Sequence, residues 1–451
     1  HVIHCFEREC SIQRRHQKII EEAPSPAVDD ALRRRMTDAA LAAARAVGYR
    51  NAGTVEFVVD ADGEFAFLEV NTRLQVEHPV TEAVTGLDLV REQLLVAQGL
   101  PLSVRQEDLG LRGHAIEARL YAEDPEAGFL PATGELLDWH EPAAPPARWD
   151  SGVATGSVVG VEWDPMLAKV IAHAPDRGEA ATALALALER ARIRGVTTNR
   201  DFLVAALRHT RFLTGATTTD FVETAGVATR RHPESDEIRT AAVLAALSAQ
   251  GRRRAHAPVL RSLPSGWRNS VMPPESVTYR TRDGEVVVTY RAGRDGVFAG
   301  RVVTAADSDS EGHDFRATVF GWDGDTFRAE IDGRGRAGRL LEHGHRCWVQ
   351  TSSGDVELER VPRFPVAGAE AVSGALAAPM PGRVLAVHVE PGARVSAGDA
   401  LVVVEAMKME HLVSAPHAGT VTEVRVGAGD QVAAGDLLVV LADSEAQEAA
   451  S

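Results

Sequence analysis

The sequence contains few cysteines, no long apolar segment and no excess of basic residues. Three cysteines (Cys5, Cys10 and Cys347) are too few and too scattered for a disulfide framework or a zinc site, which suits a reducing cytosol. No uninterrupted apolar run is long enough to span a bilayer. A net charge of −16 would repel a phosphate backbone. These absences predict a cytoplasmic protein that binds neither nucleic acid nor membrane.

The start of the sequence also lacks a methionine and a signal peptide. The chain opens at His1 within strand-like sequence, so we expect the C-terminal part of a longer protein. A length of 451 residues exceeds one ordinary core and predicts three or four domains.

The character of the sequence changes along the chain and predicts a multidomain α+β protein. Residues 1–102 combine helices with a hairpin, and residues 103–222 mix strands with a helix. An amphipathic helix over 236–250 precedes an all-β stretch at about 275–361, where Asp-Gly and Ser-Gly pairs divide alternating runs into a meander or barrel. Residues 362–374 form a flexible linker.

Glycines mark the predicted ends of the helices. Apolar residues recur three or four positions apart over 32–47, which predicts a helix there. Helices are also expected over 81–97 and about 177–192. A glycine follows each of them closely, at Gly48, Gly99 and Gly195.

One pattern occurs twice near the end of the chain, at an offset of 37 residues. It begins as Pro379-x-x-Gly382-x-Val384 and returns as Pro416-x-x-Gly419-x-Val421. Repeated short strands with glycine turns predict two similar half-sheets that fold into a flattened barrel. Lys408 lies in the connection between the copies, so a hairpin tip would hold its amine out in water.

A hairpin in the first domain brings acidic residues together. Residues 54–60 and 64–71 alternate as strands joined near Asp62-Gly63, a dipeptide preferred in two-residue turns. That turn places Glu56 opposite Glu69. It also gathers apolar side chains on the other face as a core, namely Val55, Phe57, Val59, Ala66, Leu68 and Val70.

Two facing carboxylates repel each other, and a divalent cation between them removes the conflict. Mg²⁺ prefers carboxylates together with substrate phosphates, so Glu56, Glu69 and the neighbouring Asn71 are candidate metal ligands. Arg73 follows on the same face. A three-residue loop would flip the register, and the competing interpretation is a solvent-facing strand with ordinary charges.

Longer motifs carry a resemblance to a known family. The stretch Glu69–Glu82, Glu-Val-Asn-Thr-Arg-Leu-Gln-Val-Glu-His-Pro-Val-Thr-Glu, resembles the signature of the biotin carboxylase branch of the ATP-grasp enzymes. The same resemblance extends to Gln13–Lys18, Gly48–Phe57 and Gly113–Asp124. The run Ala-Met-Lys-Met around Lys408 resembles the biotinyl domain of biotin-dependent carboxylases, where this lysine carries biotin. A lipoyl domain has the same fold, but its lysine usually follows aspartate.

The resemblance covers about 1–222 and 375–442 and implies a fold for each part. The expected segments are the C-terminal half of an ATP-grasp biotin carboxylase (1–102), a biotin carboxylase C-terminal domain (103–222), a helix plus antiparallel β-barrel that docks a subunit (223–361), a linker (362–374), a flattened β-barrel biotinyl or lipoyl-like domain (375–442) and a disordered tail (443–451).

The resemblance also implies ligands for the motif residues. Glu56, Glu69 and Asn71 would hold Mg²⁺ or Mn²⁺ ions that bridge the phosphates of ATP, and His16 would contact the nucleotide. Lys18 would bind bicarbonate.

Arg73 and the backbone of Val76 would complete the bicarbonate site, with Arg73 catalytic. Glu77, with a pKa in the range of a general base, would remove a proton. Arg119 would contact biotin and stabilise negative charge on it; the competing interpretation is an outward-facing strand arginine.

The family's glycine-rich lid, which contacts ATP phosphates, has no counterpart in this sequence. Gly152-x-x-x-Gly156 and Gly392 are turn glycines, because neither follows a strand into a helix. We therefore expect no ATP turnover by the chain as given, and the family's activity would belong to the full-length protein.

The middle region resembles the barrel domain of acyl-CoA carboxylase α subunits, and the run Leu263–Asn269 favours this branch. Pyruvate carboxylase places a larger domain there, and carboxylases specific for urea or acetyl-CoA carry different insertions. The resemblance implies an α subunit that carboxylates biotin on Lys408 and works in a hetero-oligomer with a carboxyltransferase β subunit and a biotin protein ligase. Propionyl-, acetyl- and methylcrotonyl-CoA remain open as acceptors. The competing hypothesis is a carrier and docking piece without activity of its own.

Overall fold

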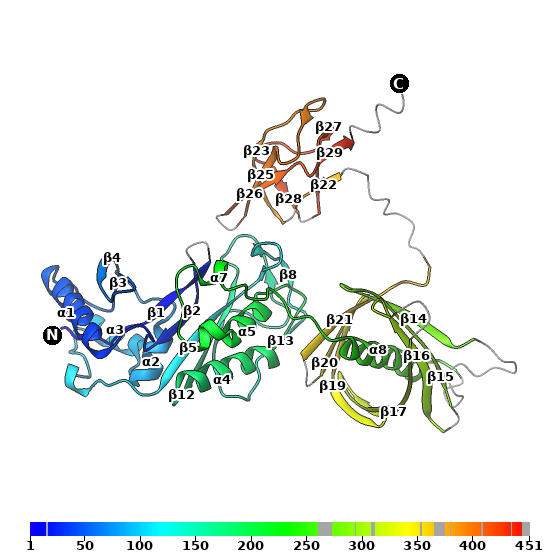
Figure 1. The fold of residues 1–451 in the computed structure, drawn as a ribbon, viewed down its shortest axis with the longest axis horizontal. Helices are drawn as coiled ribbons and strands as arrows, with labels where there is room; N and C mark the ends of the chain where they lie inside the picture. Colours follow the sequence, from blue (N-terminus) through cyan, green and yellow to red (C-terminus); the bar gives the residue numbers. More distant parts are fainter. Residues whose placement is uncertain are drawn as a thin grey trace. The chain divides into compact units, whose positions relative to one another are not determined.

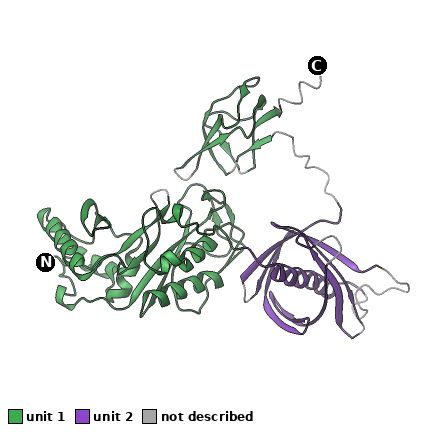
Figure 2. Cartoon of the chain, viewed as in Figure 1, with its two compact units in different colours: residues 1–231, 372–451 green, residues 232–371 purple. Residues whose placement is uncertain are grey.

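The computed structural model describes the chain except for residues 15–16, 260–272, 294, 308–311, 352–353, 365–374, 379, 407–408, 434 and 444–451. It divides into two compact units (Figure 2). One unit contains residues 1–231 and 372–451, and the other contains residues 232–371. Among the described residues, none of the helices is both long enough and apolar enough to cross a membrane.

An antiparallel sheet organises residues 1–231 (Figure 1). Its strands, in spatial order, are β1 (Glu9–Arg14), β2 (Gln17–Ala23), β5 (His114–Tyr121), β12 (Met166–Ala174) and β10 (Arg148–Ser151). Central strand β5 pairs with β2 through Glu21↔Glu117 and with β12 through Lys169↔Arg119. Residues far apart in the sequence therefore share one face of the sheet.

Helices cover both faces of this sheet. Helices α4 (Arg177–Arg190) and α5 (Arg200–Arg208) pack on the face that presents Ile116, Ala118 and Leu120 and form the main core with it. The opposite face presents Ala115, Glu117 and Arg119, because side chains alternate along a strand. On that face α2 (His78–Thr85) buries Val80 and Val84 against Ala115 and Ile171.

The first helix follows the prediction, whereas the second does not. Helix α1 (Asp30–Ala46) is capped by the Asp29 side chain and is followed by Gly48 at φ +60°. The expected single helix over 81–97 is wrong, because the chain forms α2 and then α3 (Leu89–Ala97). Gly86 ends α2 in the left-handed region at φ +75°, and the side chain of Asp88 caps α3.

Short elements complete this part of the chain. Helix α4 ends at Arg190, two residues before the predicted limit, since the chain then enters β13. The short elements are η1 (Gln106–Asp108), β6 (Glu123–Asp124), β7 (Leu130–Pro131), β8 (Gly134–Glu135), β9 (Asp138–His140), β11 (Val158–Val159), β13 (Arg192–Arg194), α6 (Thr210–Leu213) and α7 (Phe221–Thr224).

The hairpin of β3 (Thr54–Val59) and β4 (Phe65–Asn71) has the predicted pairing of Glu56 with Glu69. The predicted two-residue turn is wrong, since Asp60 pairs with Glu64 around a three-residue loop in which Gly63 has φ +77°. A register shift between Glu56 and Phe57 leaves Leu68 as an extra residue. The bulge compensates for the longer loop, so the two acids still face each other.

The apolar residues of this hairpin differ from the expected core. Phe57 pairs with Phe67 and stacks edge-on against Phe65, so it does not share a face with Ala66 as predicted. Phe67 and Leu68 are 60% and 58% exposed. The one-residue bulge changed which side chains share a face beyond it.

The second unit is a closed antiparallel barrel, as the sequence predicts. It consists of β14 (Glu275–Thr281), β15 (Gly284–Ala292), β16 (Val297–Thr304), β17 (His313–Asp323), β18 (Thr326–Ile331), β19 (Arg334–His343), β20 (Arg346–Thr351) and β21 (Gly354–Arg360). Pairing of Tyr279 with Arg360 closes it. The expected Asp332-Gly333 turn has both residues at positive φ, the conformation that tight hairpins favour.

Helix α8 (Ser235–Ala255) lies inside the barrel (Figure 1) and is longer than predicted. The sequence predicts an amphipathic helix, but every residue from Thr240 to Gln250 is buried. Its apolar side chains share one core with barrel residues such as Val288 and Phe327. The amphipathic expectation is wrong because strands surround the helix on all sides.

The last domain contains two interleaved sheets related by the sequence repeat. One has the order β22 (Ala375–Ala377), β29 (Leu437–Asp443), β27 (Gly419–Val424), β24 (Arg394–Val395), and the other has the order β26 (Met409–Ser414), β25 (Ala400–Ala406), β23 (Gly382–Val387), β28 (Gln431–Val432). Equivalent bonds recur 37 residues apart: Gly398 N donates to Ala415 O and Gly435 N to Ala378 O, both at 2.8 Å. The predicted flattened barrel of two half-sheets is confirmed.

Candidate active site

The hairpin places two carboxylates around one amide. Asn71 Nδ2 donates to Glu56 Oε1 at 3.0 Å and to Glu69 Oε1 at 2.9 Å. The three candidate metal ligands therefore converge on one point. Glu69 is exposed, whereas the Glu56 side chain is only 20% exposed.

Lys18 of β2 joins the hairpin to helix α2. Its Nζ lies 2.8 Å from Glu56 Oε1 and 3.0 Å from Glu77 Oε1. Gln75 Nε2 donates to the same Glu56 oxygen at 2.7 Å. A single ammonium group thus lies between two predicted site carboxylates from different elements.

Arg119 of β5 continues this chain of charges. Its Nη2 donates to Glu77 Oε2 at 3.0 Å, and its Nε donates to Glu21 Oε1 at 2.6 Å. The Arg119 side chain is 12% exposed and faces the site, so the expectation of an outward-facing strand arginine does not hold. Glu56, Lys18, Glu77 and Arg119 form one continuous ion-paired row.

The charges in this row set its protonation states. Burial would raise the pKa of Glu77, but the positive charges of Arg8 and Lys18 outweigh it and lower that pKa. Burial would also raise the pKa of Glu56, but the hydrogen bonds from Lys18 and Gln75 outweigh burial and lower this pKa. Glu77 is therefore a carboxylate in this state, with its pKa below the range expected of a general base, because Arg8, Lys18 and Arg119 bring positive charge to it.

Arg73 follows the hairpin and remains accessible. It is exposed, and its bonds to Asn71 Oδ1 and to the carbonyl of Leu74 are both long, at 3.4 Å. A guanidinium held this loosely can receive a planar anion with little loss of existing contacts.

The residues before α2 are fixed by groups that sequence reasoning missed. Lys169 Nζ of β12 donates to the Val76 carbonyl at 2.7 Å. Arg8 donates to Gln75 Oε1 at 2.8 Å and to Thr81 Oγ1 at 3.1 Å. The sequence feature that could have identified Lys169 is its place as the one lysine within the apolar run Met166–Ala172. Arg8 offered no comparable signal.

Two predicted site residues lie outside the described residues. His16 follows β1, and Lys408 lies between β25 and β26 in the sequence. The strands that flank Lys408 pair up to Ala406↔Met409. The described part of the site therefore consists of the hairpin, β2, β5 and the start of α2.

The donor set of the hairpin meets the main requirements of a divalent cation. Two carboxylates and one amide suit Mg²⁺, provided that Asn71 presents Oδ1 rather than Nδ2. In the described part of the chain, no three His, Cys, Asp or Glu residues form a group that could hold a metal ion. The residues fit a cation that takes further oxygen ligands from a bound phosphate.

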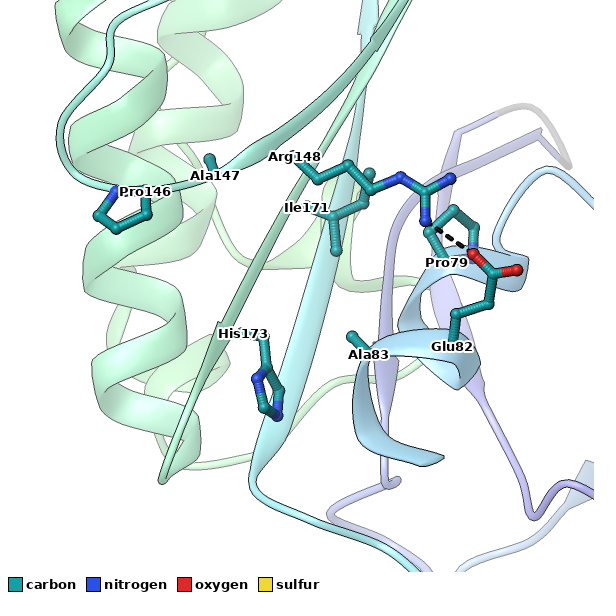
Figure 3. A pocket seen from close by; sticks show the side chains of 8 residues that line it. All are labelled: Pro79, Glu82, Ala83, Pro146, Ala147, Arg148, Ile171 and His173. Carbon is teal, nitrogen blue, oxygen red and sulfur yellow. Dashed lines mark hydrogen bonds and ion pairs between the residues drawn. The ribbon is translucent and has the colours of Figure 1, made fainter. Parts of the chain in front are cut away.

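A separate pocket of about 500 Å³ lies beside α2 (Figure 3). It is lined by Pro79, Glu82 and Ala83 of α2, by residues 146–148, and by Ile171 and His173 of β12. Arg148 crosses it to reach Glu82 at 2.7 Å. None of the predicted site residues lines this pocket.

Four family profiles match successive parts of the chain. They are described as carbamoyl-phosphate synthase L chain, ATP binding domain (residues 1–105); biotin carboxylase C-terminal domain (117–224); methylcrotonyl-CoA carboxylase, alpha-subunit, BT domain (236–363); and biotin-requiring enzyme (374–441).

Relatives include the mitochondrial methylcrotonoyl-CoA carboxylase subunit alpha of Rattus norvegicus, 38% identical over 91% of this chain and 58% of that protein. The propionyl-CoA carboxylase alpha chain of Ruegeria pomeroyi is 38% identical over 91% of this chain and 63% of that protein. The chain thus spans about three fifths of the length of these relatives.

A similar solved structure is the biotin carboxylase domain of Hydrogenobacter thermophilus 2-oxoglutarate carboxylase, in complex with MgADP, ADP and bicarbonate. It has a TM-score of 0.50 and 38% identity and covers 51% of each chain. Together, the four domain matches and these relatives make the chain similar, over 91% of its length, to the α subunits of methylcrotonoyl-CoA and propionyl-CoA carboxylases.

Proposed function

We propose that this chain carboxylates biotin attached to Lys408, using ATP and bicarbonate, as the α subunit of an acyl-CoA carboxylase. The observation that carries the proposal is the ion-paired row of Glu56, Lys18, Glu77 and Arg119, which joins the acidic hairpin to the central sheet. It supplies metal-binding, anion-binding and proton-accepting groups within one hydrogen-bonded set.

The hairpin would hold the nucleotide's metal ions. Glu56, Glu69 and Asn71 already converge, and a cation in place of the Asn71 amide protons would relieve the repulsion between the acids. Held by these three residues, Mg²⁺ or Mn²⁺ would supply positive charge for phosphoryl transfer from ATP. His16 would contact the nucleotide.

Lys18, Arg73 and the backbone of Val76 would bind bicarbonate. Arg73 offers a planar fork, and Lys169 fixes the Val76 peptide by holding its carbonyl. Positioning an anion beside the transferred phosphate lowers the entropic cost of the reaction. Arg73 is the catalytic member of this group, because its few weak contacts leave it free for the substrate.

Glu77 would accept a proton once an anion is bound. In the free site burial favours the neutral acid, but Arg8 and Lys18 outweigh burial and lower the pKa of Glu77. A bicarbonate ion paired to Lys18 would compete for that ammonium charge and raise the pKa of Glu77 toward the range of a general base.

Arg119 would bind and orient biotin, the group that supplies a ureido nitrogen for carboxylation. Its guanidinium is anchored by Glu21 of β2 and by Glu77, which directly precedes α2, so the remaining donor edge is fixed in direction. A fixed donor of this kind stabilises charge that develops on an oxygen.

The partner would be a carboxyltransferase β subunit that transfers the carboxyl group to an acyl-CoA. The barrel of residues 236–363 supports this, since its profile is that of the BT domain of a carboxylase α subunit. A biotin protein ligase would modify Lys408. We propose a hetero-oligomer in the cytoplasm, with propionyl-, acetyl- or methylcrotonyl-CoA as the acceptor.

The catalytic part is tested by bicarbonate-dependent ATP hydrolysis with the full-length protein. Arg73→Ala and Glu77→Ala should each remove most of this activity, whereas Arg34→Ala, an exposed arginine of α1, should leave it unchanged. Retained activity in the first two variants would show that these residues are misassigned.

The carrier and docking parts are tested separately. After co-expression with a biotin ligase, mass spectrometry should find the added mass on Lys408, and none on Lys408→Arg. An unmodified Lys408 would end the carrier proposal. Deleting 236–361 should abolish co-purification with a carboxyltransferase subunit, and a surviving complex would exclude the barrel as the docking site.

A further inference from the structure

A fully buried pair of facing glutamates lies in the central sheet beneath α2. Glu21 of β2 and Glu117 of β5 are direct partners in the antiparallel register. Directly opposed residues bring their Cβ atoms to about 4.5–5.5 Å, close enough for the carboxyl groups to interact. Both residues are 0% exposed, so water cannot separate their charges.

The two carboxyl groups have different partners. Glu21 Oε1 accepts from Arg119 Nε at 2.6 Å, while its buried Oε2 has no hydrogen-bond partner within the described part of the chain. Among the described residues, neither oxygen of Glu117 has a hydrogen-bond partner. Burial raises the pKa of Glu21 to about 7 even though Arg119 favours its ionised form, whereas Glu117 has no hydrogen-bond donor of this kind among the described residues.

Charged groups of both signs surround the pair. Arg119 and Lys169 act on Glu117 from β5 and β12, and the carboxylates of Glu21 and Glu77 act from β2 and the start of α2. Burial, followed by the charge of Glu21, raises the pKa of Glu117 well above its ordinary value despite the two cations. Glu117 is thus the member of the pair that holds a proton.

We propose that Glu117 is a positioning residue: it stays protonated, donates to the free oxygen of Glu21, and thereby keeps Glu21 as the charged anchor of Arg119. No proton leaves the pair during the reaction. The proposal deepens the proposed function and rests on it, since Arg119 matters to catalysis only if it binds biotin.

Burial gives this arrangement its physical reason. Two carboxylates cannot both be ionised in a site without water, so one proton must remain. If Glu117 were ionised, that proton would belong to Glu21, and Arg119 Nε would lose its charged partner. Glu77, the same group that is needed as the base, would then be the remaining ionised partner of Arg119 among its ion pairs with the described residues.

Isosteric changes on the two facing strands test the proposal. Glu117→Gln keeps a neutral donor in place, so bicarbonate-dependent ATP hydrolysis and carboxylation of free biotin by the full-length protein should stay within about threefold of wild type. Glu21→Gln removes a charge-assisted hydrogen bond and should lower kcat for biotin carboxylation about 10- to 100-fold. Equal losses, or a larger loss in Glu117→Gln, would overturn the proposal.

A measurement without ATP, biotin or metal separates this inference from the proposed function. An acid whose pKa is raised in the fold contributes stability that is fully present below its unfolded pKa and is lost as pH rises toward the folded pKa. Glu117→Gln should therefore unfold at a higher temperature than wild type at neutral pH, and the gain should shrink toward pH 4.5, the ordinary value for glutamate.

An infrared spectrum of the wild-type protein at neutral pH should also show a protonated carboxyl band that Glu117→Gln lacks. A missing band, or a thermal difference that does not depend on pH, would overturn the proposal. Absence of bicarbonate-dependent ATP hydrolysis in the wild type would instead refute the proposed function. The thermal unfolding and the infrared spectrum would still test the protonation of Glu117, because neither needs activity.

Discussion

Among the glutamates that face each other across antiparallel strands in the described residues, two pairs lie in opposite environments. Glu56 and Glu69 pair on the β3–β4 hairpin, where Glu69 is exposed. Glu21 and Glu117 pair in the central sheet, where neither is accessible to solvent. In the first pair an amide lies between the acids. In the second, one acid has an arginine, and the other has no hydrogen-bond partner among the residues that the structure describes.

These two pairs meet the same electrostatic conflict in different ways, and they differ in their access to solvent. An accessible pair can recruit a hydrated cation from solution, because the ion keeps water or phosphate oxygens as its other ligands. A buried pair has no room for those ligands and takes up a proton instead. Arg119 and Lys18 connect the two pairs through Glu77.

Removing one acid from each pair should give the largest contrast. Glu69→Gln should lower kcat/KM for ATP in the full-length protein about 10²- to 10³-fold, the usual loss when a preorganised charge is removed from a site. Glu117→Gln should change it little. Glu64→Gln, on the same hairpin and exposed, is the matched control. A Glu69 variant with normal dependence on Mg²⁺ would show that the hairpin binds no metal.

Replacing an arginine should cost more stability where its acidic partners are buried than where they are partly exposed. Arg119→Met leaves the buried Glu21 without its ion pair and leaves Glu77 paired with Lys18, and it should lower the free energy of unfolding by about 3 kcal/mol at neutral pH. Arg148→Met removes partly exposed pairs with Glu82 and Asp150 and should cost about 1 kcal/mol or less. Urea unfolding measures both, and similar losses would contradict the distinction.

Much of this arrangement followed from short-range patterns in the sequence. Alternation and the Asp-Gly pair placed Glu56 opposite Glu69, and this pairing is confirmed even though the turn was wrong. Two errors cancelled there, since a three-residue loop and a bulge at Leu68 each shift the register by one. Alternation of apolar and polar residues cannot reveal a bulge. A bulge adds one residue to one strand, and the sequence does not show where that extra residue lies.

The buried pair could not have been predicted in the same way. Glu21 and Glu117 are 96 positions apart in the sequence, and only the order of strands in the sheet makes them neighbours. The same holds for Lys169 and Val76. Helix α8 shows that burial is equally hard to predict from sequence. Its residues predict one apolar face, yet a barrel built from later strands buries all faces of its middle part.

The acid dependence of stability should separate the ion-paired Glu77 from the protonated Glu117. Burial favours the neutral form of Glu77, but Arg8 and Lys18 outweigh burial and lower its pKa. Its contribution to stability is therefore present above pH 4.5 and is lost as pH falls through the lowered pKa, the opposite direction from Glu117. Thermal unfolding of Glu77→Gln without metal should lack this acid-side loss. An unchanged slope would mean that Glu77 is not ion-paired in the folded protein.

The smallest effect should come from Lys169 of β12, which acts on the charge of Glu117 and also contacts the residues before α2. Lys169 pairs with Arg119 across the sheet and holds the Val76 carbonyl at 2.7 Å. Lys169→Met removes that bond, so KM for bicarbonate should rise about fivefold, the factor for one hydrogen bond of about 1 kcal/mol, with little change in kcat. Lys169→Arg should restore much of the loss. If kcat falls instead and KM stays constant, Lys169 acts through Arg119 and the buried pair, and the Val76 peptide is not its route to the substrate.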